Sequence, residues 1–342
     1  MTATERVVLV AGGTGGLGRA VSLAFLGEGA RVVVTYRKAE ELALLKELAG
    51  DNGSRLDGDN VDVTDEAEVS GLVETIVVRH GRLDALVNTV GGYAGGVKLW
   101  EMETKVFEQM LTLNLRSGYA LARAAVRVML KQGSGAIVNV AAKAAIDHGA
   151  GAAAYAASKA AAVAMIDCLA EDLKGTGVRA NSVLPSIIDT EANRKAVPKA
   201  DFAKWPKAEE IARVIVFLCG DGARVIHGAA VRVMLKQGSG AIVNVAAKAA
   251  IDHGAGAAAY AASKAAAVAM IDCLAEDLKG SGVRANSVLP SIIDTEANRK
   301  AMPKADFAKW PKPEEIARVI VFLCGDGARV IHGAAVPVFG NG

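Results

Sequence analysis

A tyrosine and a lysine four residues apart are the side chains of this sequence best suited to proton transfer. Tyr155 and Lys159 open a segment with helical periodicity, 155–173, so both side chains are expected on one face of a helix. A nearby ammonium favours the phenolate and is expected to lower the pKa of the phenol from its usual value of about 10. Such a phenol can pass a proton while another group passes a hydride. Asn114 is a candidate to hold a water molecule in the same proton relay.

A run of glycines near the N-terminus has the composition of a phosphate-binding turn. Residues 12–18 read Gly-Gly-Thr-Gly-Gly-Leu-Gly, directly after the apolar strand candidate Val7–Ala11 and before a helical segment. Glycine lets the backbone approach a pyrophosphate, and the N-terminus of the helix supplies amide donors. In this strand-turn-helix context the run predicts a dinucleotide-binding turn. The residues expected against the cofactor are Gly12, Thr14, Gly16, Leu17 and Gly18.

The end of the second strand candidate, Arg31–Thr35, bears on the choice between NAD(H) and NADP(H). Sites for NAD usually carry an acid about 20 residues after the glycines, where it binds the ribose 2′-hydroxyl. Here the strand is followed by Tyr36, Arg37 and Lys38. With no acid and two cations at this point, the sequence favours NADP(H) over NAD(H), with Arg37 near the 2′-phosphate. The alternative is that both cations only begin a solvated helix.

Strand and helix candidates alternate along the first 235 residues. Continuous apolar strands are expected at Leu83–Val87, Ala136–Val140 and Ala180–Leu184, and a long helix is expected near 103–130. Parallel strands with both faces covered by helices have this pattern, and right-handed crossovers then give a doubly wound sheet. The sequence therefore predicts an α/β fold of the Rossmann-like, doubly wound kind, with the glycine turn at the carboxyl end of its first strand.

The sequence of the C-terminal half of this predicted domain occurs twice in the chain. Residues Ala124–Gly228 recur as Ala229–Gly333, at an offset of 105 residues and with three differences. We interpret the chain as one domain, 1–235, followed by a duplicated half-domain, 236–342, with the material of three strands and their helices but no glycine turn. The surplus half is expected to hide its apolar edge in a homo-oligomer, by pairing with another chain or by domain swapping.

The repeat also creates two ambiguities. The heptapeptide Ala-Ala-Val-Arg-Val-Met-Leu continues a helical pattern at 124–130, but at 229–235 it stands where the other copy has a strand-like segment. It is therefore expected to be helical in one place and extended in the other. Tyr260 and Lys264 form a second pair, which would serve if the second copy completed the domain. Use of the first copy is favoured, because it leaves the long helix uninterrupted.

Charge and composition argue against several classes of protein. The chain has 39 Lys+Arg and 37 Asp+Glu, so its net charge of +2 gives no general reason to bind nucleic acid or an anionic membrane. The longest apolar runs, such as Val214–Cys219, are too short to span a bilayer, and the N-terminus has no signal-peptide layout. The four cysteines form no CxxC pair, so no metal site is predicted. The expectation is a cytoplasmic protein with a small-molecule substrate and no nucleic-acid or membrane partner.

In combination, the glycine turn, Asn88–Gly91, Asn114 and the Tyr155–Lys159 pair resemble the short-chain dehydrogenase/reductase family. The resemblance covers residues 1–237 and returns in the second copy. It implies an NAD(P)-dependent oxidoreductase in which the tyrosine delivers the proton and the lysine also contacts the cofactor. The further cofactor contacts that the resemblance implies are Asp62, Val63, Asn88, Gly91, Pro185, Ile188 and Thr190.

A narrower resemblance is to the dihydropteridine reductases, carried by Gly91–Gly96, Ala142–Asp147 and residues 189–205. The wider family usually has a serine thirteen residues before the tyrosine, but position 142 is alanine, as it is in dihydropteridine reductases. Losing such a donor costs about 10²–10³ in rate where an oxyanion develops. A quinonoid dihydropterin, which is protonated on a conjugated ring, is therefore the implied substrate.

Two departures separate this chain from the dihydropteridine reductases: Tyr93 replaces a tryptophan, and the acid that selects NADH is missing. One alternative is a carbonyl or alcohol oxidoreductase that uses a donor other than serine. Another is a non-catalytic, dinucleotide-binding assembly protein inactivated by the duplication. Tyr93 and Trp205 are candidates to sandwich a flat ring. The full set of candidate substrate contacts is Ala142, Tyr93, His148 and Trp205.

Overall fold

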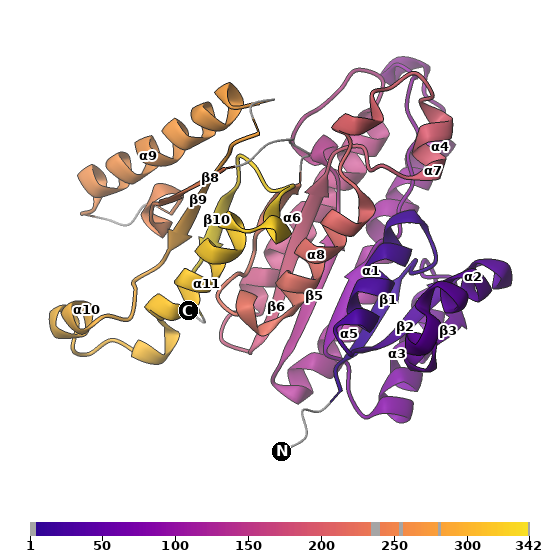
Figure 1. The fold of residues 1–342 in the computed structure, drawn as a ribbon, viewed down its shortest axis with the longest axis horizontal. Coiled ribbons are helices and arrows are strands. Elements are labelled where there is room, and N and C mark those ends of the chain that lie inside the picture. The colour runs from indigo at the N-terminus through magenta and orange to yellow at the C-terminus, as the bar shows by residue number, and fades with distance from the viewer. Residues whose placement is uncertain (1–4, 234–239, 253–255, 280–281, 341–342) are drawn as a thin grey trace.

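The computed structural model describes residues 5–233, 240–252, 256–279 and 282–340, and its larger part is built on one parallel sheet. Seven strands lie in the order β3-β2-β1-β4-β5-β6-β7, so the predicted doubly wound α/β architecture is confirmed. Figure 1 labels β1, β2, β3, β5 and β6 of this sheet among the helices that cover it. The order reverses between β1 and β4. The strands are β1 (Val7–Ala11), β2 (Arg31–Tyr36), β3 (Leu56–Asn60), β4 (Ala85–Asn88), β5 (Gly135–Val140), β6 (Val178–Pro185) and β7 (Ala230–Val233).

Helices cover both faces of this sheet. Every residue of β1 and of β4 is buried, as expected for central strands with a hydrophobic layer on each side. One face packs against α1 (Gly16–Gly27), α2 (Ala39–Ala49) and α8 (Ala208–Cys219). The opposite face packs against α3 (Glu66–His80), α5 (Ser117–Gln132) and α6 (Ala153–Asp172), with α4 (Thr104–Leu111) beside α6. The short α7 (Glu191–Ala196) lies in the connection between β6 and α8.

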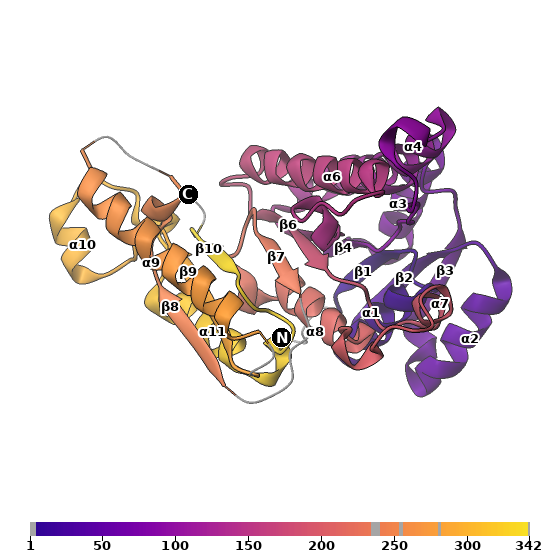
Figure 2. The ribbon, with the colours of Figure 1, turned by 90° about the horizontal axis from the view of Figure 1, so that it is seen from above.

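The second copy of the repeated sequence forms a separate sheet of three parallel strands, in the order β10-β9-β8. Figure 2 shows this part beyond β7, at the end of the large sheet opposite β3. The first strands of the domain, and with them the glycine turn, have no counterpart there. Its elements are β8 (Ala241–Val245), α9 (Ala258–Asp277), β9 (Arg284–Pro290), α10 (Glu296–Ala301), α11 (Pro313–Cys324) and β10 (Ala335–Val338).

The repeated heptapeptide adopts two conformations. Residues 124–130 lie within α5, whereas Ala230–Val233 form β7 and pair with β6. The prediction is confirmed for these residues, and 234–235 lie outside the described part of the chain. The surroundings of each copy decide its conformation. Residues 230–233 lie against the free edge of β6, whereas 124–130 continue a helix that has already begun.

The second copy hides an apolar face within its own chain. One hydrophobic cluster runs from α1 and α8 into α11, with Ile215 and Val319 both fully buried. The rings of Phe217 and Phe322 stack at a centroid distance of 3.6 Å and an interplanar angle of 9°. This face of the surplus half is therefore covered within the chain, while the oligomer expected from its apolar edge stays a prediction.

β8, the outer strand of the three-stranded sheet, has apolar side chains exposed to solvent. In β8, Ile242 is 39% and Val245 is 44% exposed, whereas Ile137 and Val140, which have the same places in β5, are 1% and 7% exposed. The difference arises because β5 is flanked by β4, while β8 is the last strand of its sheet. An edge strand with exposed apolar residues is the kind of surface that pairs with another chain.

Within the described part of the chain, two helices are long and apolar enough to cross a membrane, although their continuous apolar runs are short. They are α6 and α9, each of 20 residues with a mean hydropathy of 1.3. Helix α6 packs against the large sheet and carries Lys159, which is buried. A core helix of a folded domain satisfies the same length and composition test, so α6 is explained by its packing.

Candidate active site

The glycine turn joins β1 to α1 at the point where the strand order reverses. Gly12 has a φ of +73°, a conformation that L side chains rarely adopt. A Cβ on Gly18 would lie 2.0 Å from the Gly12 carbonyl oxygen, and a Cβ on Gly13 would lie 2.4 Å from Val34 Cγ1. These glycines let the turn fold tightly against β2 and let α1 start directly beneath it.

The N-terminus of α1 fits an anionic group. Gly15 is the N-cap, so no side chain there bonds the first amides of the helix, and the first turn carries no acid. The amide of Gly12 donates to Thr35 Oγ1 at 2.8 Å, which fixes the turn to the second strand. Free amides at the positive end of a helix, in a cradle without side chains, suit the pyrophosphate of a dinucleotide. The residues present therefore fit the predicted cofactor.

Asn114 lies in a π-helical turn, Thr112–Arg116, between α4 and α5. The side chain is 1% exposed. Its Oδ1 accepts a hydrogen bond from the Gly92 amide at 2.9 Å, and its Nδ2 donates to the Gly92 carbonyl at 3.1 Å and to Ser158 Oγ at 3.0 Å. The amide thus ties the loop after β4 to helix α6. Single π-helical turns inside α-helices are frequently found at functional sites.

Lys159 reaches the same point from α6. Its Nζ donates to the Val140 carbonyl at 3.0 Å, at the carboxyl end of β5. A Cβ on Gly91 would lie 2.9 Å from both Lys159 Nζ and Asn114 Oδ1, so only glycine leaves room for the two groups. Burial lowers the pKa of Lys159 to about 8, because its charge is removed from water.

Tyr155 is half-buried one helical turn before Lys159, and its ring meets Tyr93 edge-on at a centroid distance of 5.0 Å. Burial, with a smaller contribution from Tyr93, raises the pKa of Tyr155 to about 12. The expectation of a lowered phenol pKa is therefore wrong for the cofactor-free protein. The cause is desolvation of the half-buried phenol, which disfavours the phenolate, and Lys159 is not among the groups that shift this pKa.

The pKa of Lys159 gives a testable pH dependence of stability. Between pH 8 and its ordinary pKa of 10.5, the unfolded chain binds the proton that the folded chain releases. Burial of the charged ammonium costs the folded state stability below pH 8, and this cost has disappeared above pH 10.5. The free energy of unfolding therefore rises with pH in this window. Relative to Lys159→Met, the wild-type protein should gain about 2 kcal/mol between pH 8 and pH 10.

Denaturant unfolding of the cofactor-free proteins at pH 7, 8, 9 and 10 measures this gain. Lys264→Met, at the less buried counterpart in α9, is the matched control and should not remove it. A wild-type advantage that is the same at pH 7 and pH 10 would show that Lys159 is not desolvated.

The second tyrosine–lysine pair lies elsewhere. Tyr260 is 52% exposed on α9, and Lys264 Nζ lies 5.9 Å from the centre of its ring. Both residues lie on α9, in the second copy of the repeat, which also forms the three-stranded sheet. The sequence of this copy contains no counterpart of Asn114 or of the glycine turn. The structure therefore brings Tyr155 and Lys159, and not this alternative pair, to the predicted cofactor cradle.

The other predicted cofactor residues surround the same end of the sheet. Asn88 pairs with Ala11 in the strand register, and its Nδ2 donates to Asn139 Oδ1 at 3.0 Å. Val63 is buried, and Asp62 accepts hydrogen bonds from Thr64, which hold the pKa of its carboxyl below the usual value. Arg37 lowers that pKa further, so its guanidinium lies near Asp62 on the side where an adenosine would bind.

The segment after β6 closes over the glycine turn. A Cβ on Gly16 would lie 2.9 Å from Thr190 Cγ2, so Thr190 touches the start of α1. The Ile188 carbonyl accepts from Asn193 Nδ2 at 2.8 Å, and Pro185 ends β6. Thr190 thus lies beside the glycine turn, and the cofactor contacts implied for Pro185, Ile188 and Thr190 stay predictions.

The candidate substrate residues do not all converge. Ala142 is 7% exposed just beyond β5, and Tyr93 covers Tyr155. His148 is exposed in the loop before α6. Trp205 packs on Phe202 at a centroid distance of 5.0 Å and is 8% exposed, and a sandwich of a flat ring between Tyr93 and Trp205 stays a prediction.

An acid near the cradle was missed in the sequence. Glu41 in α2 accepts a hydrogen bond from Thr14 Oγ1 at 3.2 Å and pairs with Lys38 Nζ at 3.6 Å. It lies beyond the strand end where a ribose-binding acid is usual. Its position within the first turn of a helix that starts at Ala39 is the signal that could have found it.

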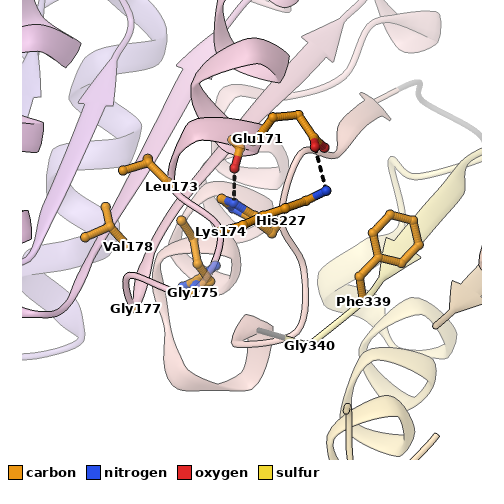
Figure 3. A pocket seen from close by; sticks show the side chains of 11 residues that line it. Glu171, Leu173, Lys174, Gly175, Gly177, Val178, His227, Phe339 and Gly340 are labelled. Atoms are coloured by element: carbon orange, nitrogen blue, oxygen red, sulfur yellow. Dashed lines mark hydrogen bonds and ion pairs between the residues drawn. The ribbon is translucent and has the colours of Figure 1, made fainter. Parts of the chain in front are cut away.

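The pocket in Figure 3 belongs to another part of the molecule. Glu171, Lys174 and His227 line it beside Phe339 and Gly340 from the C-terminal segment. None of the predicted site residues is among the described residues that line it. The described residues also contain no cluster of three or more His, Cys, Asp or Glu side chains that could hold a metal ion.

Comparisons with known proteins give one consistent result. A family profile described as short chain dehydrogenase matches residues 6–201, and one described as enoyl-(acyl carrier protein) reductase matches residues 228–340. The chain is 32% identical over 237 residues to the 3-oxoacyl-[acyl-carrier-protein] reductase FabG of Thermotoga maritima, with 67% of this chain and 96% of the relative covered. It is 35% identical over 234 residues to a D-threitol dehydrogenase of Mycolicibacterium smegmatis, with 66% and 89% covered.

Among solved structures, ElxO with NADP bound superposes with a TM-score of 0.64 and is 28% identical, covering 67% of this chain and 96% of ElxO. The two curated relatives act, by name, on a 3-oxoacyl carrier and on D-threitol, and neither is a pterin reductase. The aligned lengths correspond to the chain with one copy of the repeat.

Proposed function

The chain belongs to the short-chain dehydrogenase family and is an oxidoreductase that uses a nicotinamide dinucleotide, and from that premise we propose that it reduces a small molecule at Tyr155. The observation that carries this proposal is the meeting of Asn114 and Lys159 beside Gly91, next to Tyr155 and the glycine turn. A proton donor, a cation and a phosphate cradle are then found at one end of one sheet.

Each residue has a role in this proposal. The turn from Gly12 to Gly18 holds the pyrophosphate, and Lys159 and Thr190 hold the nicotinamide half. The bound cofactor supplies the hydride. Tyr155 donates its phenolic proton to the substrate, and Asn114 keeps the loop after β4 in place. A pKa of about 12 keeps Tyr155 protonated near neutral pH, so its hydroxyl holds the proton that reduction requires.

For the cofactor, we propose NADP(H) over NAD(H). Arg37 is exposed near Asp62, while Lys38 is already paired with Glu41. Arg37 is therefore the cation available to a 2′-phosphate, and Glu41 is partly neutralised by Lys38. A guanidinium bonds a phosphate through two parallel N–H groups, which gives it an advantage over an ammonium.

Arg37→Ala tests this assignment. Because a hydrogen bond to a charged group contributes about 1.5–3 kcal/mol, the variant should raise the KM for NADPH about tenfold or more and leave that for NADH unchanged. Lys46→Ala removes the same charge from an exposed position of α2 and should change neither. Equal KM values for NADPH in the wild type and Arg37→Ala would remove the preference for NADP(H).

For the substrate, we propose a quinonoid dihydropterin-like ring. Ala142 offers no hydroxyl where the family usually has a serine, and the ring of Tyr93 lies beside Tyr155 in a T-shaped contact. A conjugated ring that takes up the proton on nitrogen has less need of an oxyanion donor. A second candidate is a carbonyl or alcohol substrate, which the names of the two relatives favour.

A turnover panel separates the two candidates. Purified protein is given NADPH or NADH with a quinonoid dihydropterin, a 3-oxoacyl thioester, a simple ketone or a sugar alcohol. The pterin proposal expects turnover with the dihydropterin and slow reduction of ketones. Strong ketone reduction with no pterin turnover would remove the proposal and favour the second candidate.

We also propose how the chain is organised. Residues 1–235 form the working domain, and 236–342 are a tandem duplication of its C-terminal half. The open edge of β8 supports a homo-oligomer, through pairing of this edge or through exchange of the surplus half between chains. Light scattering that shows a single chain at all concentrations would contradict the oligomer.

A further inference from the structure

Ser158 is a buried hydroxyl on the helix that carries Tyr155 and Lys159. It directly precedes Lys159 in α6, and none of its surface is exposed. Its Oγ donates to the Tyr155 carbonyl at 2.8 Å and accepts a hydrogen bond from Asn114 Nδ2 at 3.0 Å. Two hydrogen bonds in series therefore connect the first turn of α6 to the π-helical turn.

The connection continues to the loop after β4. Asn114 Nδ2 carries two hydrogens, and its second acceptor is the Gly92 carbonyl at 3.1 Å, while Oδ1 accepts from the Gly92 amide at 2.9 Å. The sulfur of Met110, at 3.7 Å from Nδ2, is a weak acceptor. Gly92 thus fixes the orientation of the amide, and Ser158 receives the hydrogen that points toward α6. Buried hydrogen bonds in series strengthen one another, because the local dielectric constant is low.

The second copy of the repeat separates this connection from the local helical bond. Ser263, the counterpart of Ser158, donates to the Tyr260 carbonyl at the same distance of 2.8 Å. That bond therefore follows from the sequence of the helix alone. Ser263 is exposed, however, and the sequence of the second copy has no counterpart of Asn114. The bond from Asn114 is the feature that distinguishes the serine of α6.

From these contacts we propose that Ser158 is a positioning residue for the reaction at Tyr155, and that its hydroxyl ties the first turn of α6 to Asn114 and the loop after β4. The inference rests on the proposed function at Tyr155. Because Ser158 has no exposed surface, it acts through the backbone of Tyr155 and not on the substrate. Without this tie, α6 and the loop can shift independently, and a displacement of about 1 Å at a reacting group can cost a factor of 10² in rate.

The first experiment compares kcat and KM in three serine variants. Ser158→Ala should lower kcat about tenfold or more and leave the KM for NADPH unchanged, because the cofactor cradle lies on β1 and α1. Ser158→Thr keeps the hydroxyl and should restore most of kcat. Ser263→Ala removes the same local bond from α9 and should leave kcat at the wild-type value.

Ser117→Ala controls for the loss of a buried serine as such. Ser117 is also fully buried and lies directly after the π-helical turn, and its Oγ donates to the Leu113 carbonyl at 2.7 Å. The variant should lower the melting temperature without lowering kcat. A kcat loss in Ser158→Ala that is no larger than the loss in Ser117→Ala would overturn the proposal.

Amide exchange at Gly92 gives a readout that needs no turnover. Gly92 lies outside the repeat, so its peptides occur once in the chain. Ser158→Ala should speed exchange of this amide, because Asn114, to which the amide donates, is then no longer held from α6. Ser117→Ala should not speed it. Unchanged exchange at Gly92 in Ser158→Ala would contradict the tie.

A double variant tests whether the serine acts through Asn114. Asn114→Ala with Ser158→Ala should lose no more kcat than Asn114→Ala alone, since residues of one hydrogen-bond network are not additive. Additive losses would overturn the proposal. If the wild type reduces no substrate in the turnover panel, the proposed function fails, whereas exchange at Gly92 still decides whether Ser158 holds the loop through Asn114.

Discussion

Tyr155→Phe should reduce turnover by about 10²–10⁴-fold, because general acid catalysis by a positioned side chain contributes a factor of this size. The change removes one hydroxyl and keeps the ring that packs against Tyr93. Cofactor binding should persist, since the phosphate cradle lies on β1 and α1. Steady-state kinetics with a substrate found in the turnover panel, together with a fluorescence titration of NADPH, measures both quantities.

The repeat provides a matched control for this substitution in the same molecule. Tyr260→Phe removes the same hydroxyl from the same local sequence, but on a helix without the glycine turn or a counterpart of Asn114. Its turnover should equal that of the wild type. If Tyr260→Phe abolished turnover and Tyr155→Phe did not, the second copy would be the one that completes the active domain.

Gly18→Ala should abolish cofactor binding, with an affinity for NADPH lower by about a hundredfold or more. The new Cβ would lie 2.0 Å from the Gly12 carbonyl oxygen and 2.8 Å from Thr89 Oγ1, so the turn and the loop after β4 must both move. Displacement of binding groups by about 1 Å can cost a factor of 10². A fluorescence titration of the variant measures the loss.

Gly27→Ala is the corresponding control in the last turn of α1. No atom lies within 4 Å of a Cβ at this position. Alanine there should leave NADPH affinity unchanged and stabilise the fold by about 0.5–1 kcal/mol, because glycine loses more conformational entropy in a helix. Normal NADPH affinity in Gly18→Ala would mean that the turn does not bind the cofactor.

Local sequence predicts the first part of this fold well. The apolar strand Val7–Ala11 and the glycines after it define the switch point, and all of β1 is buried. β3 (Leu56–Asn60) was not predicted, because its Asp57, Gly58 and Asp59 are poor strand formers. It forms at the edge of the sheet, where pairing with β2 supplies what the residues themselves lack.

The site shows where local reasoning ends. The spacing of Tyr155 and Lys159 predicts their shared helix face, but not that Lys159 bonds Val140 and is buried. That contact depends on how α6 packs over β5, and burial of the Tyr155 phenol in the same packing raises its pKa, opposite to the expected direction. Likewise, the repeat is plain in the sequence, but the packing of α11 on α8 depends on the tertiary arrangement of both copies.

The most direct measurement of the central claim is a crystal structure of the protein with NADP bound. We expect the pyrophosphate at the N-terminus of α1 and the nicotinamide ring beside the hydroxyl of Tyr155, with Lys159 in contact with the cofactor. A nicotinamide ring beside Tyr260, or a nucleotide bound away from the turn between β1 and α1, would contradict it.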